Sequence, residues 1–343
     1  MADRLDPVAV RVILALETSC DDTCAAVVTS EGAIRSNVIS SQGVHDRYGG
    51  VVPEIASRHH LDLIGAVIDD ALAQASVSLA EVSLVAVTRG PGLVAALLVG
   101  VATAKGLAAA HGLPLAPVDH LHGHVAASFL GAAPFEPPFL SLIASGGHTL
   151  LAVVNDRGPD FEVIGQTLDD AAGEAFDKGA RLLGLGYPGG AALERLARDG
   201  DATAFEFPTG QRRPGLDFSF AGLKTALLYR IRDLGEEEAG RRRADLAASY
   251  QRAIIEALTL RVQRALTATG LERLAIGGGV AANGPLRLRL ASLGIPMDVP
   301  PRELCTDNAA MIASAARYVP ALPYPDYLDL DVYATGEPAL SAR

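Results

Sequence analysis

The chain has 343 residues, of which 49% are hydrophobic and 20% are charged, and this composition excludes a disordered protein. With 40 acidic and 29 basic residues the net charge is −11, which excludes a protein that binds nucleic acid through its overall charge. Any polyanion must therefore meet a local basic patch or be held by a partner protein. A chain of this length predicts two domains.

The cysteines and the N-terminal sequence indicate a cytoplasmic protein. Three cysteines, an odd number, favour a reducing compartment over a framework of disulfides. Residues 1–11 lack the basic-then-apolar pattern of a signal peptide. Residues 93–110 are apolar apart from Lys105, but a central lysine and the preceding glycine loop favour a buried helix over a membrane span. We therefore expect no membrane partner.

Strand-like and helix-like segments alternate along the chain, a pattern typical of α/β proteins. The first half predicts strands at residues 14–16, 25–28 and 84–88 and helices at residues 53–74 and 93–110. After a proline-rich crossing at residues 133–138, the second half predicts strands at residues 139–143, 150–154 and 274–276, a long helical region at residues 236–269, and a helix after the glycine loop at residues 277–279. The predicted lobes are residues 11–130 with about 308–335, and residues 131–307.

The two predicted lobes open with similar sequences. Seven identical residues recur at an offset of 126 positions between segments 14–28 and 140–154, and each segment predicts a hairpin with a small polar tip. Two such tips can hold the phosphate of a nucleotide from both sides through backbone N–H groups. Ordinary tight turns that need Ser and Gly are the alternative. The glycine loop at residues 277–279 favours the nucleotide interpretation, since it also follows a strand and opens a helix.

Eight motifs, in one order, carry a more specific resemblance. They are LETSCDD at 16–22, YGGVVPE at 48–54, GPGL at 90–93, SGGHT at 145–149, DDAAGEAFDK at 169–178, YPGG at 187–190, FSFAGLK at 218–224 and CTDN at 305–308. Over roughly residues 12–318 the chain resembles the tRNA N6-adenosine threonylcarbamoyltransferase family, once labelled O-sialoglycoprotein endopeptidase. The resemblance implies an α/β protein with the duplicated two-lobe fold of actin, Hsp70 and sugar kinases, and a nucleotide and metal cleft between the lobes.

The same resemblance implies an activity and partners. It implies transfer of the threonylcarbamoyl group from threonylcarbamoyl-adenylate to N6 of adenosine 37 in tRNAs that read codons beginning with A, with release of AMP. Besides tRNA, the implied partners are a paralogous inactive partner subunit and a small ATPase. The alternative is a small-molecule kinase or ATPase on the same fold, which would bind Mg²⁺ through oxygen ligands and would not need paired histidines.

A metal site is predicted from two histidines and a distant aspartate. His120 and His124 stand four residues apart, so a helix places both on one face, and Asp307 lies at a predicted helix start. Two imidazoles and one carboxylate leave open positions, which suits a catalytic divalent ion, Fe(II) or Zn(II). The spacing alone leaves a structural or exposed histidine pair open. The resemblance implies that all three residues are ligands, with Fe(II) favoured.

The histidine segment departs from the family and from peptidases. His122 stands where the family usually has Glu, and its spacing of two from each neighbour predicts that it points off the ligand face. Leu121 follows the first histidine, where a zinc peptidase of the H-E-x-x-H type needs its glutamate base. Peptide hydrolysis is therefore excluded.

The resemblance assigns the donor nucleotide to residues of the second lobe. They are Ile143, Ala144, Ser145, Gly146, Gly147, Asp177, Gly190, Glu194 and Asn283. Glycines permit close approach of the backbone to a phosphate, and Asp177 and Glu194 can accept hydrogen bonds from ribose hydroxyls. A surface pair of Asp177 with Lys178 or Arg181 is the alternative.

The predicted catalytic pair lies at the first hairpin tip. Asp21 and Asp22 occupy positions where the family usually has Asp-Glu, and the duplication is expected to set this tip opposite the Ser145 loop. A carboxylate there can accept the proton of the attacking amine. A cap for the following turn is the alternative role of either residue.

Overall fold

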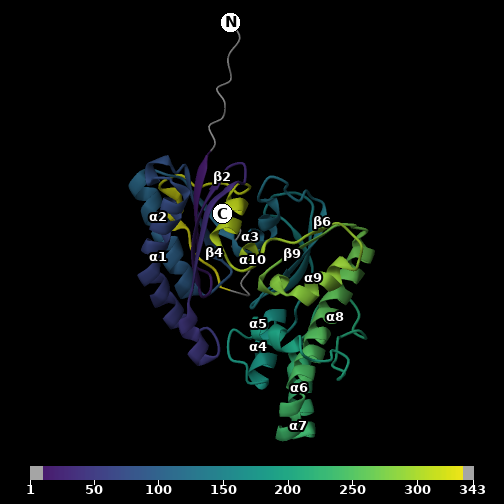
Figure 1. Cartoon of the computed structure of the whole chain (residues 1–343). Coiled ribbons are helices and arrows are strands. Elements are labelled where there is room, and N and C mark those ends of the chain that lie inside the picture. The colour runs from purple at the N-terminus through teal and green to yellow at the C-terminus, as the bar shows by residue number, and fades with distance from the viewer. Residues whose placement is uncertain (1–10, 335–343) are drawn as a thin grey trace. The chain divides into compact units, whose positions relative to one another are not determined.

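The computed structural model describes residues 11–334, and within them the chain divides into two compact units (Figure 1). Unit 1 comprises residues 11–42, 53–134 and 308–334, and unit 2 comprises residues 43–52 and 135–307. Residues 43–52, which the sequence predicts to lie in the first lobe, group with unit 2. They include the short 3-10 helix η1 (Gly43–Tyr48). Arg181 donates a hydrogen bond to the backbone oxygen of Gly49, and this contact helps to explain the grouping.

Unit 1 is built on a five-stranded mixed sheet with the order β3-β2-β1-β4-β5. The strands are β1 (Val12–Glu17), β2 (Asp22–Thr29), β3 (Ile34–Ser41), β4 (Leu84–Gly90) and β5 (Leu115–Asp119). The helices are α1 (Pro53–Ala75), α2 (Val94–His111), α3 (His120–Ala126) and α11 (Ala309–Ala316), with the 3-10 helices η2 (Leu79–Glu81), η3 (Ala127–Phe129) and η5 (Asp326–Asp329). Consecutive strands β1, β2 and β3 pair antiparallel, whereas β4 pairs parallel with both β1 and β5.

Helices on both faces of the unit 1 sheet explain why β1 is apolar from Val12 to Leu16. Leu14 and Leu16 of β1 join the core formed with α1 and α2. Helix α11 also packs against β1 and β2, and Ala15, which lies between those two leucines, is fully buried as well. Because successive side chains of a strand point to opposite faces, a strand covered on both faces reads as a continuous hydrophobic run.

Unit 2 has a second five-stranded mixed sheet with the order β10-β9-β6-β7-β8. The strands are β6 (Phe139–Ala144), β7 (Thr149–Val154), β8 (Glu162–Gln166), β9 (Leu274–Gly277) and β10 (Met297–Asp298). The helices are α4 (Ala172–Leu182), α5 (Gly189–Ala197), α6 (Ala221–Leu234), α7 (Glu236–Arg241), α8 (Arg243–Thr269), α9 (Gly284–Ala291) and α10 (Arg302–Cys305), with the 3-10 helix η4 (Gly279–Ala282). The core of this unit lies between the sheet, α4, α5 and the long helix α8.

The two sheets have the same topology, which confirms the predicted duplicated α/β fold. In each, the first strand pairs antiparallel with the second and parallel with the fourth. The repeated residues Leu14 and Leu140 lie in β1 and β6, the first strands of the two sheets. Ser19 comes two residues after the end of β1, and Ser145 comes directly after the end of β6. The internal sequence repeat therefore marks the opening hairpin of each unit.

Helix α2 meets the length and hydropathy criteria of a membrane span, and 33% of its 18-residue window is buried in unit 1. Its buried positions are mostly small residues, among them Ala96, Gly100 and Ala104, and they let the helix pack closely against β4 and α1. The core helix of a soluble protein passes the same criteria. One face of the helix therefore packs inside an α/β unit, but the rest of the window is half-buried or exposed, so the helix is less buried than predicted.

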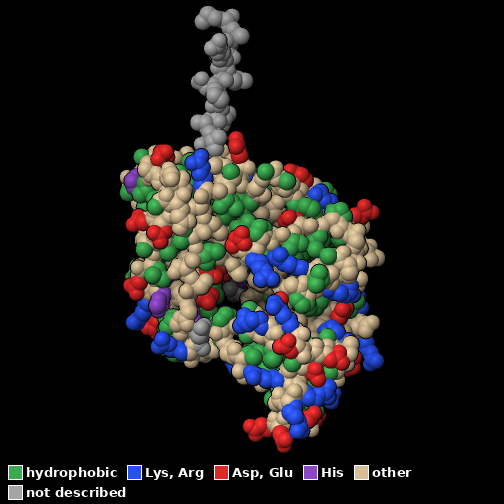
Figure 2. Space-filling model, viewed as in Figure 1, with side chains coloured by type: hydrophobic (Ala, Val, Ile, Leu, Met, Phe, Trp, Pro, Cys, Tyr) green, Lys and Arg blue, Asp and Glu red, His purple; other side chains and the backbone are tan. Residues whose placement is uncertain are grey.

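Helix α7 carries the charged stretch that precedes the long helix of unit 2. Arg241 pairs with Glu237 at 3.2 Å and with Glu238 at 2.7 Å along the same helix surface. Figure 2 shows acidic and basic side chains meeting at the tip where α7 lies. The side chains of Arg241 and Glu237 are 64% and 88% exposed, so this stretch is a solvated face, and exposed pairs of this kind add only about 0.3–0.5 kcal/mol each.

Candidate metal centre and nucleotide loops

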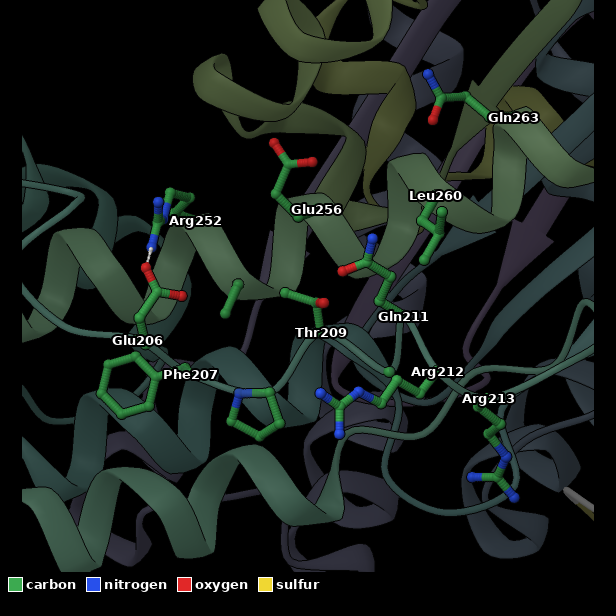
Figure 3. Close-up of a pocket in the computed structure, with 13 residues that line it drawn as sticks. Glu206, Phe207, Thr209, Gln211, Arg212, Arg213, Arg252, Glu256, Leu260 and Gln263 are labelled. Carbon is green, nitrogen blue, oxygen red and sulfur yellow. Dashed lines mark hydrogen bonds and ion pairs between the residues drawn. The ribbon is translucent and has the colours of Figure 1, made fainter.

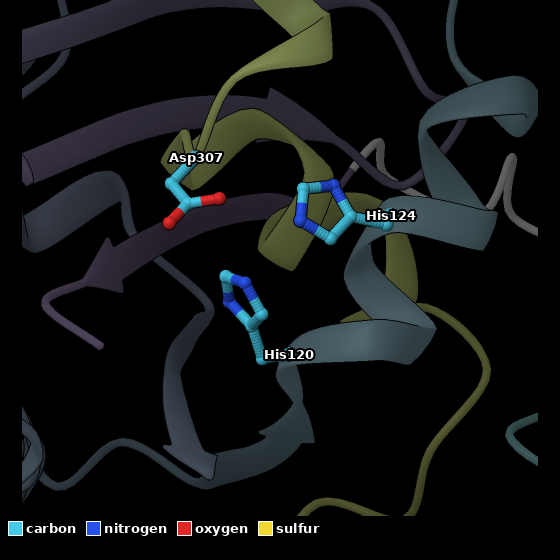
Figure 4. A group of neighbouring side chains, drawn as sticks. All are labelled: His120, His124 and Asp307. Atoms are coloured by element: carbon cyan, nitrogen blue, oxygen red, sulfur yellow. The ribbon is translucent and has the colours of Figure 1, made fainter. Parts of the chain in front are cut away.

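Three side chains converge, two from one short helix and one from the residue before the N-cap of another (Figure 4). His120 and His124 lie on α3, and Asp307 precedes α11. One ligand atom from each of the three residues lies within 4.8 Å of the other two. The imidazole rings are nearly perpendicular, with centroids 4.7 Å apart, and both histidines are at least 96% buried. The predicted metal-ligating residues are therefore brought together as a group that can hold a metal ion.

Local sequence explains why α3 begins at the first histidine. Asp119 is the N-cap, and its carboxylate accepts hydrogen bonds from the backbone N–H groups of Leu121 at 2.8 Å and His122 at 3.1 Å. The hydroxyl of Tyr333 donates a further hydrogen bond to the same carboxylate. Burial and the charge of Asp119 raise the pKa of Tyr333, so this hydroxyl keeps its proton. The cap thus fixes the start of the helix that carries both histidines.

The position of Asp307 follows from the packing of α11 on α3. Asp307 directly precedes Asn308, whose side chain caps α11 by accepting from the backbone N–H of Met311 at 3.0 Å. The two helices approach at Gly123, where a Cβ atom would lie 2.7 Å from Cδ1 of Ile312. A glycine in this turn therefore lets α11, and the aspartate before it, come close to the histidines.

A buried glutamate orients the first histidine. Glu17, at the end of β1, is fully buried, and its Oε2 lies 2.9 Å from Nδ1 of His120. Thr88 donates to the same oxygen at 2.6 Å, and Ser19 lies 3.2 Å from the same ring nitrogen. Because a carboxylate accepts, Nδ1 carries the proton and Nε2 keeps the lone pair that a metal requires. This donor set fits a divalent ion.

His122 lies outside this group of ligands. Its side chain is fully buried, although it is not among the three residues whose ligand atoms converge. This agrees with the expectation that a residue at spacing two points away from the shared face of His120 and His124.

The first hairpin tip, residues 18–21, contacts His120 within unit 1. Asp21 and Asp22 are both half-buried, and Asp22 begins β2. The backbone oxygen of Ser19 accepts from the N–H of Leu93 at 2.8 Å, and that of Asp21 accepts from Gln42 at 3.2 Å. The backbone of the tip is thus held to the rest of the unit, and the hydroxyl of Ser19 in the tip lies 3.2 Å from Nδ1 of His120.

A buried histidine on α1 contacts the first hairpin tip and the start of β2. His60 of α1 lies 2.8 Å from the hydroxyl of Thr23 and 3.0 Å from the backbone oxygen of Cys20. Burial lowers the pKa of His60, against the opposing influence of the Cys20 hydrogen bond and of Glu17. A neutral His60 therefore braces the start of β2, a role that the sequence analysis did not predict.

The second hairpin tip presents exposed backbone. Ile143 and Ala144 end the buried strand β6, and Ser145 forms a turn in which its hydroxyl accepts from the N–H of His148 at 3.0 Å. Gly146 and Gly147 are exposed, with open space where a Cβ would be. The backbone of this tip is therefore accessible to a ligand.

The third glycine loop packs directly on the second tip. Gly278 has φ of +85°, and a Cβ there would lie 2.4 Å from the backbone oxygen of Ala144. Both the backbone conformation and the close approach require glycine. The structure thus brings the Ser145 tip and the loop after β9 together within unit 2, two features that lie far apart in the sequence.

The remaining predicted substrate-binding residues form two smaller clusters in unit 2. Asp177 accepts a hydrogen bond from the backbone N–H of Gly189 at 2.8 Å, beside Gly190 at the start of α5. Lys178, the alternative partner of Asp177, pairs with Asp170 at 2.6 Å and also with Glu174. The Asp177 contact therefore ties α4 to the N-terminus of α5.

The second of these clusters surrounds Asn283. Its amide nitrogen donates to Glu194 at 3.1 Å and to Gln251 at 2.9 Å, and its oxygen caps α9 by accepting from Leu286 at 2.9 Å. The structure thus joins Glu194 and Asn283 directly. Gln251 of α8 was missed by the sequence analysis, because nothing in a long helix marks one glutamine as a contact of a distant loop.

Comparison with known proteins agrees with this architecture. The sequence model TsaD, described as tRNA N6-adenosine threonylcarbamoyltransferase, matches residues 33–314. The enzyme of that name from Anaeromyxobacter dehalogenans is 51% identical over 313 residues, covering 89% of this chain and 93% of its own length. The corresponding enzyme from Moorella thermoacetica is 52% identical over 315 residues, covering 89% and 91%.

Solved structures share the fold at low sequence identity. The Acidaminococcus fermentans (R)-2-hydroxyglutaryl-CoA dehydratase component A gives a TM-score of 0.57 at 14% identity, covering 90% of this chain and 97% of its own. Full-length HypF gives a TM-score of 0.56 at 14% identity, covering 90% and 54%. These structures support the fold alone, whereas the sequence matches show the family. The chain belongs to the tRNA N6-adenosine threonylcarbamoyltransferase family.

Proposed function

We propose that this protein transfers the threonylcarbamoyl group from threonylcarbamoyl-adenylate to N6 of adenosine 37 in tRNAs that read codons beginning with A, with release of AMP. The observation that carries the proposal is the family match over residues 33–314, together with the convergence of His120, His124 and Asp307. The family gives the reaction, and the convergent side chains provide a centre at which it can take place.

The chemistry explains what the protein must supply. The exocyclic amine of adenosine is a poor nucleophile, because its lone pair is delocalised into the ring. A mixed anhydride with AMP as the leaving group provides an activated donor. The protein must then hold this donor, stabilise charge on its carbonyl oxygen and accept a proton from the amine.

We assign donor binding to unit 2. Exposed backbone at Gly146 and Gly147 can approach a phosphate without side-chain interference, and the Gly278 loop packs beside it. Asp177, Gly190, Glu194 and Asn283 complete the proposed donor site, and the two carboxylates are suited to ribose hydroxyls. Their present hydrogen bonds to Gly189 and Asn283 position them for this role.

We assign the metal to His120, His124 and Asp307, with Fe(II) favoured and Zn(II) possible on the same donor set. Nε2 of His120 is the ligand atom, since Nδ1 is held by Glu17. When bound, the ion would act as a Lewis acid toward a carbonyl or phosphate oxygen of the donor. Glu17 and Ser19 hold the His120 ring for that purpose.

We assign proton acceptance to Asp21, with Asp22 as its neighbour. No described residue forms a hydrogen bond with the carboxylate of Asp21, so the alternative role of a turn cap has no contact to support it. Asp21 lies two residues from Ser19, which contacts the ligand His120. Asp22 carries a side chain one methylene shorter than the family's usual Glu and is assigned the smaller role.

We propose that the protein works in the cytoplasm with a paralogous inactive partner subunit and a small ATPase. The sequence has three cysteines, an odd number, which fits a reducing compartment. The net charge of −11 opposes tRNA binding by the chain alone, so partner subunits are expected to tighten it.

The test is a transfer assay with defined components. The protein is incubated with threonylcarbamoyl-adenylate and an unmodified tRNA transcript, with and without the partner subunits, and the nucleosides are analysed by mass spectrometry. We expect threonylcarbamoyl-adenosine at position 37. A preparation that lacks iron and zinc, forms no modified nucleoside and instead hydrolyses ATP with Mg²⁺ would favour a kinase or ATPase.

A further inference from the structure

A basic hollow lies in unit 2 between α8 and the loop of residues 206–213 (Figure 3). It has a volume of about 760 Å³. Figure 3 shows Glu256, Leu260 and Gln263 projecting from α8, with Arg212 and Arg213 on the loop below them. None of the residues assigned above to the donor, to the metal or to proton acceptance lines this hollow.

The two carboxylates of the hollow are already neutralised. Glu206 pairs with Arg252 at 3.1 Å, and Glu256 pairs with Arg289 at 2.9 Å. These pairs remove the negative charge that would otherwise repel an anion from the hollow.

Four other arginines in or next to the hollow are not neutralised by a carboxylate of the described residues. In the described part of the chain, none of Arg212, Arg213, Arg261 and Arg264 forms an ion pair. Arg264 donates to the backbone oxygen of Gln211 at 2.8 Å, and Arg261 donates to those of Gly210 at 3.0 Å and Asp217 at 2.9 Å. These hydrogen bonds to backbone oxygens fix the loop and do not neutralise the arginines. Among the residues that the structure describes, the one carboxylate whose charge acts on Arg261 is that of Asp217.

One nitrogen of the buried Arg261 guanidinium is not used in a hydrogen bond within the described residues. The residue is 3% exposed, and its Nη1 is buried without an acceptor among residues 11–334. Burial lowers the pKa of Arg261, and the charges of Arg264 and Arg213 lower it further. Arg261 lines a recess of about 10 Å³ that shares Thr209 and Arg213 with the hollow. A recess of that size holds roughly one water or one anionic oxygen.

We propose that this hollow binds phosphate groups of the tRNA backbone, an inference that depends on tRNA being the substrate as proposed above. Guanidinium groups match phosphate oxygens in charge and in bidentate geometry. The exposed Arg212 and Arg213 reach outward from a loop that Arg261 and Arg264 hold in place, so little ordering is needed on binding. In a protein of net charge −11, such a patch provides the local attraction that RNA requires.

The test compares two charge reversals of equal size. Arg212→Glu with Arg213→Glu changes the hollow, and Arg58→Glu with Arg232→Glu is the matched control on exposed helix positions of α1 and α6. Binding of a fluorescent unmodified tRNA transcript is measured from low to physiological salt, with thermal unfolding as the check on folding. We expect the first variant to bind tRNA at least about tenfold more weakly and to lose about two units of the salt slope. The control is expected to bind like the wild type.

A second variant removes charge without reversing it. Arg212→Gln with Arg213→Gln is expected to weaken tRNA binding to an intermediate extent and to leave affinity for threonylcarbamoyl-adenylate unchanged. Wild-type tRNA affinity and salt slope in the charge-reversed variant would overturn the proposal, and so would an equal loss in the control pair. The proposal would also be overturned if the charge-reversed variant bound tRNA normally and lost only its binding to an acidic protein. Failure of the wild-type protein to modify tRNA would instead overturn the proposed function.

Discussion

The carboxylate of Glu17, the last residue of β1, is fully buried and lies 2.9 Å from Nδ1 of His120, the first residue of α3. This pair links the first strand of unit 1 to the helix that carries both predicted imidazole ligands. A carboxylate behind a ligating histidine fixes the tautomer and the ring orientation and raises the basicity of the opposite nitrogen. Glu17 thereby becomes part of the metal centre without being a ligand.

Glu17→Gln is expected to weaken metal affinity by about 10- to 100-fold, because the amide cannot reproduce the charge behind Nδ1 of His120. Competition with a chelator measures the affinity, and Glu54→Gln on the exposed surface of α1 is the matched control. Metal affinity equal to that of the wild type would remove Glu17 from the centre.

Asp21→Asn is expected to lower the single-turnover transfer rate by about 10²-fold or more, the usual scale for the loss of a general base. Affinity for threonylcarbamoyl-adenylate should stay nearly unchanged, because the donor is assigned to residues of unit 2. Asp22→Asn should lower the rate less, and it provides the comparison within the same turn. An unaltered transfer rate for Asp21→Asn would contradict its role as the proton acceptor and favour a structural role.

Gly278→Ala is expected to destabilise the protein by about 1–3 kcal/mol, because a residue with a Cβ is strained at φ of +85°. The added Cβ would also lie 2.4 Å from the backbone oxygen of Ala144, which should disturb the second tip and weaken donor binding. Gly279→Ala is the control, since the nearest atom to its Cβ is 4.0 Å away. Urea unfolding that shows equal stability for the two variants would contradict this account of the loop.

The three cysteines are expected to react with an alkylating reagent in an order set by their burial. Cys20 is half-buried at the first tip, whereas Cys24 and Cys305 are fully buried. Burial raises the pKa of Cys305, so less of the reactive thiolate forms there. Alkylation of the native protein followed by mass spectrometry should modify Cys20 first. Equal or faster modification of Cys305 would show that the core of unit 2 opens.

The sequence predicted the two opening hairpins and the long helices, because repeated apolar runs and glycine loops mark them directly. Edge strands such as β3 and β8 were not predicted, since half-exposed residues leave no apolar pattern. The spacing of His120 and His124 predicted that they share a helix face, whereas their role as ligands followed from the family resemblance. Glu17 was not, because its contact joins residues 103 positions apart, and only the fold brings β1 beside α3.

Metal content and transfer, measured together on His124→Ala, test the central claim most directly. His124 is 98% buried beside His120 and Asp307, so removing its imidazole takes away a ligand while leaving the cap of α3 at Asp119 intact. We expect close to one equivalent of divalent metal and active threonylcarbamoyl transfer in the wild type, and neither in a variant that still unfolds cooperatively. A folded His124→Ala protein that keeps its full metal content and transfers at the wild-type rate would contradict the account.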